Sequence, residues 1–421
     1  MSGDNKKIKV LVISDSPLAP SGVAIQTRYM IEAMLSTGKY KFICLAGAIR
    51  HNSYEPFKVE PYGDDLIVHP VDEYGNPEII RSLMSMQKPD ILWFMTDPRF
   101  FVWLWQMEDE IRPNIPMVYY HVWDNYPYPT YNKKFYTSND VICSISKVTD
   151  DIVRNVAPSV KCFHVPHTVD TNIFKKFDNG DLRVSKFRKN TNSENRFLVF
   201  WNNRNARRKQ SGSLIFWFKQ FLDIVGHDKA KLIMHTEPFD PHGQNLVKIL
   251  DSLGLVDGQV QISTQKVPPE ELSVFYNAAD CTINISDAEG FGLSTLESLA
   301  CETPIIVNMT GGLQEQVTNG SDWFGVGINP SSKAVIGSQD IPWIYEDRLS
   351  GDDVVQALLK LYNMTQEERV SLGAAGRQHV VDNYGFEKYK ENWVKVFDHV
   401  TTELGSWSER KNYNSWELIS L

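Results

Sequence analysis

Short apolar runs alternate with amphipathic segments along most of this chain. In the first half, the apolar runs predict strands, and the segments between them predict helices with one buried face. The expected strands are 9–13, 42–46, 66–68, 91–95, 117–120, 141–144 and 162–165, and the expected helices are 25–36, 78–86, 99–111 and 147–156. Strands that are apolar on both faces are typical of parallel sheets covered by helices on either side. The pattern therefore predicts an α/β protein.

The alternation stops at residues 175–196 and then resumes. This stretch, KKFDNGDLRVSKFRKNTNSENR, is polar and poor in large aliphatic side chains, which favours an interdomain connection over a long surface loop inside one domain. Further strands are expected at 197–201, 231–235, 260–263, 282–285 and 304–307, and further helices at 213–225, 244–253, 270–279, 293–301, 312–317 and in most of the sequence after 351. Two α/β domains of similar size are expected, with a ligand-binding cleft between them.

The predicted boundaries are 1–180 for a first Rossmann-like domain, 181–195 for a linker and 196–385 for a second Rossmann-like domain. Residues 386–421 are expected to form a helix that crosses back toward the first domain, followed by a polar tail. The length of 421 residues agrees with this division, since one domain usually takes roughly 100–200 residues.

Composition excludes some classes of protein and leaves others open. The 43 basic and 52 acidic side chains give a net charge of −9, which argues against a protein that coats nucleic acid or anionic lipid with its whole surface. The five cysteines include no C-x-x-C pair and are expected to be buried, reduced thiols. The apolar stretch near the N-terminus is about six residues long, shorter than a signal peptide needs, and no segment approaches the ~18 apolar residues of a membrane span. We expect a soluble, cytoplasmic enzyme.

Several catalytic motifs are missing from the sequence. It has no G-x-x-x-x-G-K-[ST], no G-x-G-x-x-G after the first strand, no H-E-x-x-H, no G-x-S-x-G and no Asp-x-Asp. These absences argue against NTPases, dehydrogenases, zinc proteases and serine hydrolases.

The segment DAEGFGLSTLESLACETPIIVNMTGG, from Asp287 to Gly312, predicts a strand end, an acidic turn with two glycines and a helix start. Glycines let backbone N–H groups approach a ligand closely, and the unpaired N–H groups of a helix start bind anions. Glu289 precedes this start and Glu297 lies within the helix. Two carboxylates that flank a phosphate site suit a nucleotide-sugar. The alternatives are a capping role for Glu289 and a solvated helix face for Glu297.

The pattern Glu289, seven residues, Glu297, within EGFGLSTLESLACETPIIV, closely resembles the donor site of the family 4 retaining glycosyltransferases of the GT-B fold. Three other segments resemble that family in the family's order: VPHTVDTNIF at 165–174, FLVFWNNRNARRKQSGSL at 197–214, and the glycine-bearing loop DSPLAPSGVAIQTRYM at 15–30. The resemblance covers most of the chain. It implies two Rossmann-like domains with parallel sheets that face each other across a cleft, the first on the acceptor side and the second binding the donor.

The family grips the donor diphosphate with the Arg and Lys of a G-R-x-x-x-x-K-G segment, which the resemblance places at Arg204 and Lys209. Asn203 and Gln210 replace the two glycines. The donor-binding residues implied are Gly22, Arg204, Lys209, Glu289, Gly290, Phe291, Gly292, Leu293, Ser294 and Glu297. The residues alone point the same way, because four cations within six positions directly after a strand, in an acidic chain, favour a phosphate site over a solvated basic loop. These are Arg204, Arg207, Arg208 and Lys209.

The resemblance implies retaining transfer from a nucleotide-diphosphate sugar, with no metal and no cofactor. Arg204, Lys209 and the N–H groups around 292–294 would stabilise the departing diphosphate. Glu289 would hold sugar hydroxyls, and Glu297 would hold the ribose. No protein nucleophile is implied, since the acceptor attacks on the face of the leaving group.

An aromatic-rich region lies between Trp93 and Tyr136, where 14 of 44 residues are aromatic, against 12% in the whole chain. In the family, a His or Asp after a comparable strand approaches the transferred sugar or the acceptor, so His121 and Asp124 are the candidate catalytic residues beside Glu289. The alternatives are a satisfied core or loop histidine and aromatic core packing. The functional interpretation of the aromatic region is an acceptor platform.

The sequence thus predicts a hexosyltransferase that transfers a sugar to a hydroxyl group, with a glycan or surface polysaccharide as the expected acceptor. One alternative is glycosylation of a hydroxylated or hydroxymethylated DNA base, which an aromatic region could hold outside the duplex. Another is a non-catalytic nucleotide-sugar binding protein, and a third is a sugar-nucleotide epimerase of the same fold. A lipid acceptor is less favoured, because no basic amphipathic helix occurs early in the first domain.

Overall fold

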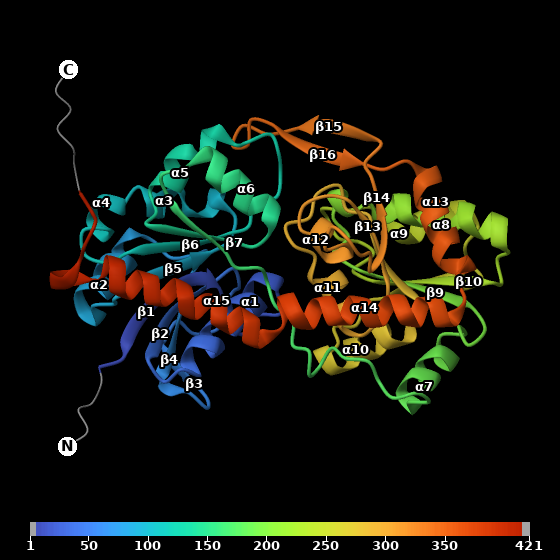
Figure 1. Cartoon of the computed structure of the whole chain (residues 1–421), viewed down its shortest axis with the longest axis horizontal. Coiled ribbons are helices and arrows are strands. Elements are labelled where there is room, and N and C mark those ends of the chain that lie inside the picture. The colour runs from blue at the N-terminus through green and yellow to red at the C-terminus, as the bar shows by residue number, and fades with distance from the viewer. Residues whose placement is uncertain (1–5, 415–421) are drawn as a thin grey trace. The chain divides into compact units, whose positions relative to one another are not determined.

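The computed structural model describes residues 6–414, and the chain divides into two compact units (Figure 1). The first unit comprises Met1–Thr168 and Phe386–Leu421, and the second comprises Val169–Gly385. Residues 1–5 of the predicted first domain and 415–421 of the predicted tail lie outside the described residues.

The first unit is built on an eight-stranded sheet with the order β3-β4-β2-β1-β5-β6-β7-β8. All neighbouring strands pair in parallel except β3, which pairs antiparallel with β4 at one edge. The strands are β1 (Ile8–Asp15), β2 (Tyr40–Gly47), β3 (Phe57–Val59), β4 (Gly63–Pro70), β5 (Ile91–Met95), β6 (Met117–His121), β7 (Val141–Ser144) and β8 (Lys161–His164). The helices are α1 (Gly22–Leu35), α2 (Pro77–Gln87), α3 (Val102–Trp105), α4 (Glu108–Ile111), α5 (Lys133–Thr137), α6 (Lys147–Val156) and, from the end of the chain, α15 (Phe386–His399).

Aromatic side chains on neighbouring positions of β5 and β6 pack on opposite faces of this sheet, as strand geometry requires. On one face, Trp93 and Tyr120 contact Trp393 of α15, with ring centroids 5.8 and 4.9 Å apart. On the other face, Phe94 stacks on Tyr119 at 4.8 Å, and both contact Trp105 of α3. Helix α15 lies beside α1, where the Tyr389 hydroxyl donates to the Gln26 carbonyl at 3.0 Å (Figure 1).

Core packing accounts for much of the aromatic-rich region. Eight of its 14 aromatic side chains are buried: Trp93, Phe94, Phe101, Trp105, Tyr119, Tyr120, Trp123 and Tyr136. The exposed or half-buried members include Tyr126 and Tyr128, whose hydroxyls both donate to Asp151, at 2.7 and 3.0 Å. An acceptor platform in this unit would therefore be limited to the remaining six rings.

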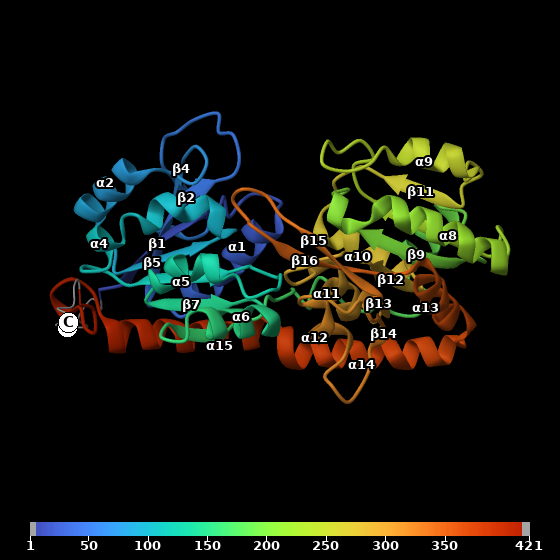
Figure 2. The same ribbon diagram turned by 90° about the horizontal axis from the view of Figure 1, so that it is seen from above.

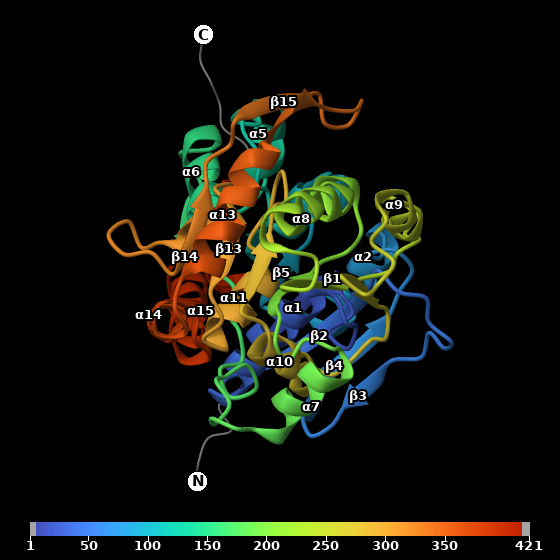
Figure 3. The same ribbon diagram turned by 90° about the vertical axis from the view of Figure 1, so that its right-hand side faces the viewer.

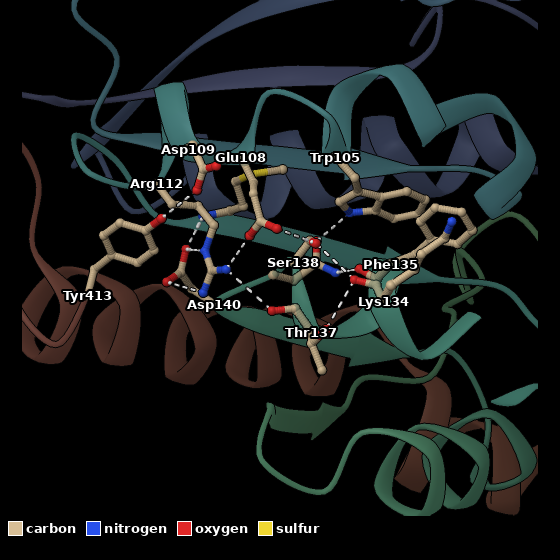
Figure 4. Close-up of polar contacts among 12 residues, drawn as sticks. Trp105, Glu108, Asp109, Arg112, Lys134, Phe135, Thr137, Ser138, Asp140 and Tyr413 are labelled. Atoms are coloured by element: carbon tan, nitrogen blue, oxygen red, sulfur yellow. Dashed lines mark hydrogen bonds and ion pairs between the residues drawn. The ribbon is translucent and has the colours of Figure 1, made fainter. Parts of the chain in front are cut away.

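Residues 410–413, after α15, are held on the first unit by a largely buried charge cluster (Figure 4). Arg112 donates to Glu108 at 2.6 Å and to Asp140 at 3.3 Å, and Arg410 pairs with Asp140 at 2.6 Å. The Arg112 guanidinium also lies over the Tyr413 ring, 4.9 Å from its centroid. Each buried charge in the cluster has an opposite partner, as burial demands.

The second unit is a six-stranded, all-parallel sheet with the order β11-β10-β9-β12-β13-β14. Figure 2 shows these strands succeeding one another across the unit, with α14 beside the β14 edge. The strands are β9 (Phe197–Asn202), β10 (Ala230–His235), β11 (Val260–Ser263), β12 (Cys281–Asn284), β13 (Ile305–Asn308) and β14 (Gly325–Ile328). The helices are α7 (Leu182–Asn190), α8 (Ser211–Val225), α9 (Leu246–Leu253), α10 (Pro269–Ala278), α11 (Leu293–Ala300), α12 (Leu313–Val317), α13 (Gly351–Asn363) and α14 (Gln366–Tyr384).

One face of this sheet is covered by α8 and by α13, which lies next to it (Figure 3). Their buried side chains share one core with the strands, including Leu214 and Phe218 from α8 and Val354 and Leu358 from α13. A separate two-stranded antiparallel hairpin, β15 (Ser332–Ile336) and β16 (Ile344–Arg348), connects β14 to α13.

The structure differs from the sequence-based boundaries in the 169–195 region. The unit boundary lies between Thr168 and Val169, and the segment expected as a linker contains α7. Tertiary contacts hold this polar helix to the second unit: the Phe187 ring lies 4.6 Å from that of Phe275, and Arg188 pairs with Asp280 at 2.7 Å. The helix expected at 99–111 is divided into a 3-10 turn at Pro98–Phe101 and the short helices α3 and α4.

Candidate functional site

Two loops of the second unit meet at the point where the order of its strands reverses. In the sheet, β9 lies next to β12, with Val199 opposite Cys281, although these strands are the first and fourth of the unit along the chain. Loops at the carboxyl ends of such neighbours form the ligand site of doubly wound sheets. Here they are residues 203–210, between β9 and α8, and 285–292, between β12 and α11. A hydrogen bond between backbone groups joins the two loops: the Asp287 N–H donates to the Arg208 carbonyl at 2.8 Å.

The first of these loops brings predicted cations to the second. Residues Arg207–Lys209 form a 3-10 turn, and Gln210 then takes a left-handed conformation with φ of 56° before α8 begins. The turn directs the Lys209 ammonium onto the Glu289 carboxylate, and the two form an ion pair. The Arg208 guanidinium bonds the Ala288 carbonyl and lies 4.0 Å from Glu289. The structure therefore places Lys209 and Glu289, two residues that the resemblance assigned to donor binding, side by side.

The Lys209–Glu289 pair is buried. Only 9% of the Lys209 side chain and 12% of the Glu289 side chain are exposed. Burial acts to raise the pKa of Glu289, but the charges of Lys209 and Arg208 outweigh it, so this pKa lies below its ordinary value. Glu289 is therefore an ionised carboxylate at neutral pH, available as an acceptor of hydroxyl protons.

Glycines shape the start of α11 around this pair. Gly292 has φ of 92° and is the N-cap residue, and among the described residues no side chain caps the helix there. Its position would put a Cβ 2.5 Å from the Leu313 side chain. At Gly311, a Cβ would lie 1.9 Å from the Glu289 carbonyl oxygen, while the Gly312 N–H donates to that same oxygen at 3.1 Å. The predicted residues 290–294 thus form an uncapped helix start, which suits an anion.

Glu297 lies one helical turn further along α11 and belongs to a hydrogen-bond chain. The Tyr276 hydroxyl donates to Glu297 at 2.6 Å and accepts from the Asn202 amide at 2.9 Å. Burial raises the pKa of Glu297 to about 7, although the Tyr276 hydrogen bond lowers it in part. The carboxyl group therefore titrates in the physiological range.

This titration predicts a pH-dependent donor affinity. With a pKa of about 7, Glu297 is ionised to about 90% at pH 8 and about 10% at pH 6. If its carboxylate accepts the ribose hydroxyl protons, the affinity for UDP-glucose falls about tenfold from pH 8 to pH 6. Titration calorimetry would measure this, since UDP-glucose itself does not titrate in that range.

Glu297→Gln provides the control for this prediction, because its side chain does not ionise. The neighbouring Asp287, whose pKa is raised to about 6 by burial, is left in place in the variant. A flat affinity profile in Glu297→Gln is expected, and an unchanged slope there would assign the titration to another group.

The other two arginines of the basic loop pair away from Glu289. Arg204, which the resemblance assigned to the diphosphate, pairs with Asp240 at 2.6 Å, and 61% of its side chain is exposed. Arg207 forms two bonds to Glu346 of β16, one of them at 2.9 Å. The basic run had already included Arg208 among the candidate phosphate cations, whereas no pattern in the sequence pointed to the residues of β16.

Gly22, His121 and Asp124 belong to the first unit. Gly22 is the exposed first residue of α1, where Ser21 accepts from the Ala24 N–H at 3.0 Å and donates to Asp15 at 2.5 Å. Asp124 is half-buried in the loop after β6. The assignments of Gly22 to donor binding and of Asp124 to catalysis stay predictions.

His121 is fully buried at the end of β6, where its Nε2 bonds the Tyr136 hydroxyl at 2.7 Å. Burial lowers its pKa to about 3, so the ring is neutral at physiological pH. Burial and the Nε2 bond match the alternative of a core histidine, but its buried Nδ1 has no hydrogen-bond partner among the described residues. The catalytic assignment of His121 also stays a prediction.

Residues 6–414 lack two features that would have pointed to a metal or a membrane. No group of three or more His, Cys, Asp or Glu side chains in that range is placed to hold a metal ion. None of the helices in the same range combines the length and apolar character that crossing a bilayer requires.

Comparison with known proteins agrees with this site. Residues 186–348, which contain both loops of the candidate site, match the family of glycosyl transferases group 1. The chain is 33% identical over 146 residues to D-inositol 3-phosphate glycosyltransferase from Acidothermus cellulolyticus, covering 32% of this chain and 31% of that protein. It is 26% identical over 269 residues to the GDP-mannose-dependent monoacylated alpha-(1-6)-phosphatidylinositol monomannoside mannosyltransferase from Corynebacterium glutamicum, covering 63% of each. The matches thus span less than two thirds of these relatives.

Solved structures show the same fold. Sucrose-phosphate synthase from Thermosynechococcus elongatus superposes with a TM-score of 0.73 at 15% identity, covering 94% of this chain and 99% of that one. Anabaena HepE in complex with UDP-glucose superposes with a TM-score of 0.69 at 15% identity, covering 93% and 99%. The predicted GT-B fold is confirmed, and residues 186–348, which carry the candidate site, resemble the group 1 glycosyl transferases.

Proposed function

We propose that this protein is a retaining, metal-independent glycosyltransferase that transfers a hexose from a nucleotide-diphosphate sugar to a hydroxyl group. The observation that carries the proposal is the buried Lys209–Glu289 pair at the uncapped start of α11, where the strand order of the sheet reverses. Such a site offers a cation and backbone N–H groups for a diphosphate, and a carboxylate for sugar hydroxyls, within one loop.

In the proposed reaction, the bond between sugar C1 and the β-phosphate oxygen breaks, and the acceptor oxygen bonds to C1. The acceptor proton goes to an oxygen of the departing diphosphate. Lys209, Arg208 and the N–H groups of residues 293 and 294 would stabilise the charge that builds on that diphosphate. Glu289 would orient the sugar, and Glu297 would hold the ribose.

For the acceptor, we propose a hydroxyl of a sugar or another polyol. The names of two relatives support this class, since one acts on D-inositol 3-phosphate and the other on a phosphatidylinositol monomannoside. The glycan or surface polysaccharide expected from the sequence belongs to the same chemical class. Because most aromatic side chains of the 93–136 region pack in the core, they give less support to an extruded DNA base.

A donor panel tests this function. The protein is incubated with UDP-, GDP- and ADP-linked hexoses without an acceptor, and release of free sugar is followed by mass spectrometry. Slow hydrolysis of at least one donor is expected, with retained anomeric configuration by NMR and no dependence on EDTA. Glu289→Ala is expected to abolish turnover while UDP still binds, which a non-catalytic binding protein would not show. If none of the donors is bound or hydrolysed, the proposal is wrong.

A further inference from the structure

Strand β16 contacts all three loops that border the candidate donor site. Its residues 346–348 lie at the base of the β15–β16 hairpin. Glu346 pairs with Arg207 of the loop after β9, and Arg348 pairs with Asp287 of the loop after β12 at 2.9 Å. The third contact is with the end of β13, where the amide of Asn308, the last residue of the strand, donates to the Asp347 carbonyl at 2.9 Å. The hairpin is therefore joined to the site at several independent points.

Backbone and hydroxyl hydrogen bonds strengthen this attachment. The Asp347 N–H donates to the Asp287 carbonyl at 2.9 Å, and the Thr310 hydroxyl donates to the Asp347 carboxylate at 2.7 Å. Asp287 lies two positions before Glu289, and Thr310 precedes Gly311, which contacts the Glu289 carbonyl. A displacement of β16 would therefore move the loop that carries Glu289.

The Glu346 carboxylate lies between two guanidinium groups. It accepts from Arg207 through both terminal nitrogens and from Arg348 at 2.6 Å, and only 2% of its side chain is exposed. By contrast, 58% of the Arg207 side chain is exposed. A guanidinium has five N–H donors in a fixed plane, so the bidentate bond orients Arg207 and leaves donors on its exposed side.

Arg207 is close in sequence and structure to the proposed phosphate cations. It shares the 3-10 turn with Arg208 and Lys209, both of which reach Glu289 or its loop. A long side chain loses rotamer freedom when it binds an anion, and a fixed arginine has already lost most of it. Because Glu346 already holds the Arg207 side chain in one conformation, a diphosphate that binds there would lose less free energy to ordering this side chain.

We propose that Arg207 is a third diphosphate-binding cation and that Glu346, anchored by Arg348, is its positioning residue. This inference rests on the proposed function, because it assigns Arg207 to the diphosphate of the same donor. The β15–β16 hairpin then forms part of the donor site, because its residue Glu346 orients Arg207.

A double-mutant cycle on the full-length protein tests the assignment, with UDP as the probe and titration calorimetry as the readout. Arg207→Ala is expected to weaken UDP binding about tenfold, as the loss of one charged hydrogen-bond donor does. Glu346→Gln is expected to weaken it about threefold to tenfold on its own. In the Arg207→Ala background, Glu346→Gln should change the affinity no further, because its effect passes through Arg207.

The controls separate positioning from a general loss of structure. Lys333→Gln removes the exposed pair with Asp347 on the same hairpin and should leave UDP affinity unchanged. Arg207→Lys keeps Glu346 paired but loses the planar fork, so it should weaken UDP binding nearly as much as Arg207→Ala even if Glu346→Gln fails to fold. Near-UV circular dichroism would verify the fold of each variant.

Two results would overturn the inference. If Glu346→Gln lowers the affinity by the same factor with and without Arg207, Glu346 acts on the fold and not through Arg207. If Arg207→Ala and Arg207→Lys bind UDP as the wild type does, Arg207 is not a diphosphate ligand. Both outcomes leave the proposed function intact, whereas a wild-type protein that binds none of UDP, GDP and ADP overturns the function and the inference together.

Discussion

Lys209→Met is expected to lower the rate of donor hydrolysis by about 100-fold or more, which is the usual effect of removing one preorganised group that stabilises developing negative charge. Lys209 is nearly buried, so its charge acts on the departing diphosphate with little screening by water. The rate is measured with the donor that the panel identifies, at saturating concentration, by release of the nucleoside diphosphate.

The same substitution leaves Glu289 without its closest cation. Breaking a buried ion pair by removing one partner costs about 3–5 kcal/mol of the free energy of unfolding, and here Arg208, at 4.0 Å, offsets part of that cost. Lys209→Met/Glu289→Gln removes the unpaired charge, so it should regain much of the stability while the activity stays low. Because Glu289 is itself assigned to the sugar, the double variant tests only whether the stability lost in Lys209→Met comes from the unpaired charge.

Lys219→Met is the matched control for Lys209→Met. Lys219 is also in the second unit and pairs with Asp223 at 2.7 Å, but both side chains are much more exposed. Such a pair contributes less than about 1 kcal/mol, and neither activity nor stability should change appreciably. A Lys209→Met protein that is folded and retains more than half of the wild-type rate would remove Lys209 from the proposed mechanism.

Most of the sheet strands could be predicted from the sequence because a buried parallel strand is a run of apolar residues. The ranges 91–95, 141–144 and 260–263 match β5, β7 and β11 at both ends. Strand β14 was not predicted, because its sequence, GVGI, contains two glycines. At one of them, Gly325, a Cβ would lie 2.0 Å from the Ile305 carbonyl oxygen, so close pairing with β13 requires a residue that strand propensity disfavours.

The elements that were missed depend on tertiary contacts and not on a local pattern. Helix α7 has no buried residue, so it has no apolar periodicity to detect. The β15–β16 hairpin has polar and half-exposed strands, and the ion pairs at its base join residues far apart in the sequence. Periodicity describes how a segment meets the core. Helix α7 and the hairpin are held instead by individual contacts with distant residues, among them the Phe187–Phe275 ring contact and the hydrogen bonds and ion pairs of β16.

The site shows the same division between local and distant information. The family resemblance of the two motifs implied that Lys209 and Glu289 share one donor site, and the structure shows why they meet: their loops follow neighbouring parallel strands. Sequence spacing could not show that Arg204 forms an ion pair with Asp240 or that Arg207 forms one with Glu346. The resemblance had selected Arg204 and Lys209 among the four cations of this loop, but only the acidic partners that the fold supplies show where each side chain points.

Gly311→Ala is expected to reduce donor turnover by about 100-fold or more, because misplacing a reacting group by about 1 Å can cost that much. Gly311 has φ of +49°, and a Cβ there would lie 1.9 Å from the Glu289 carbonyl oxygen and 2.9 Å from the Glu289 carbonyl carbon. These are backbone atoms, so no rotation of a side chain relieves the contact. The loop that carries Glu289 must move, and both the Lys209–Glu289 pair and the Gly312 hydrogen bond to Glu289 would change with it.

Gly254→Ala separates this contact from the cost of the backbone conformation alone. Gly254 follows α9 in the same unit with φ of +69°, and no atom lies within 4 Å of the position its Cβ would take. Its substitution should cost about 1–2 kcal/mol, the usual penalty for an alanine in the left-handed region, and should leave turnover unchanged. Gly311→Ala should lose about 2–3 kcal/mol more, as overpacking of a tight contact does, in thermal or urea unfolding. Equal stability of the two variants, with turnover retained in Gly311→Ala, would mean that the Glu289 loop tolerates displacement and that its geometry is not what the reaction requires.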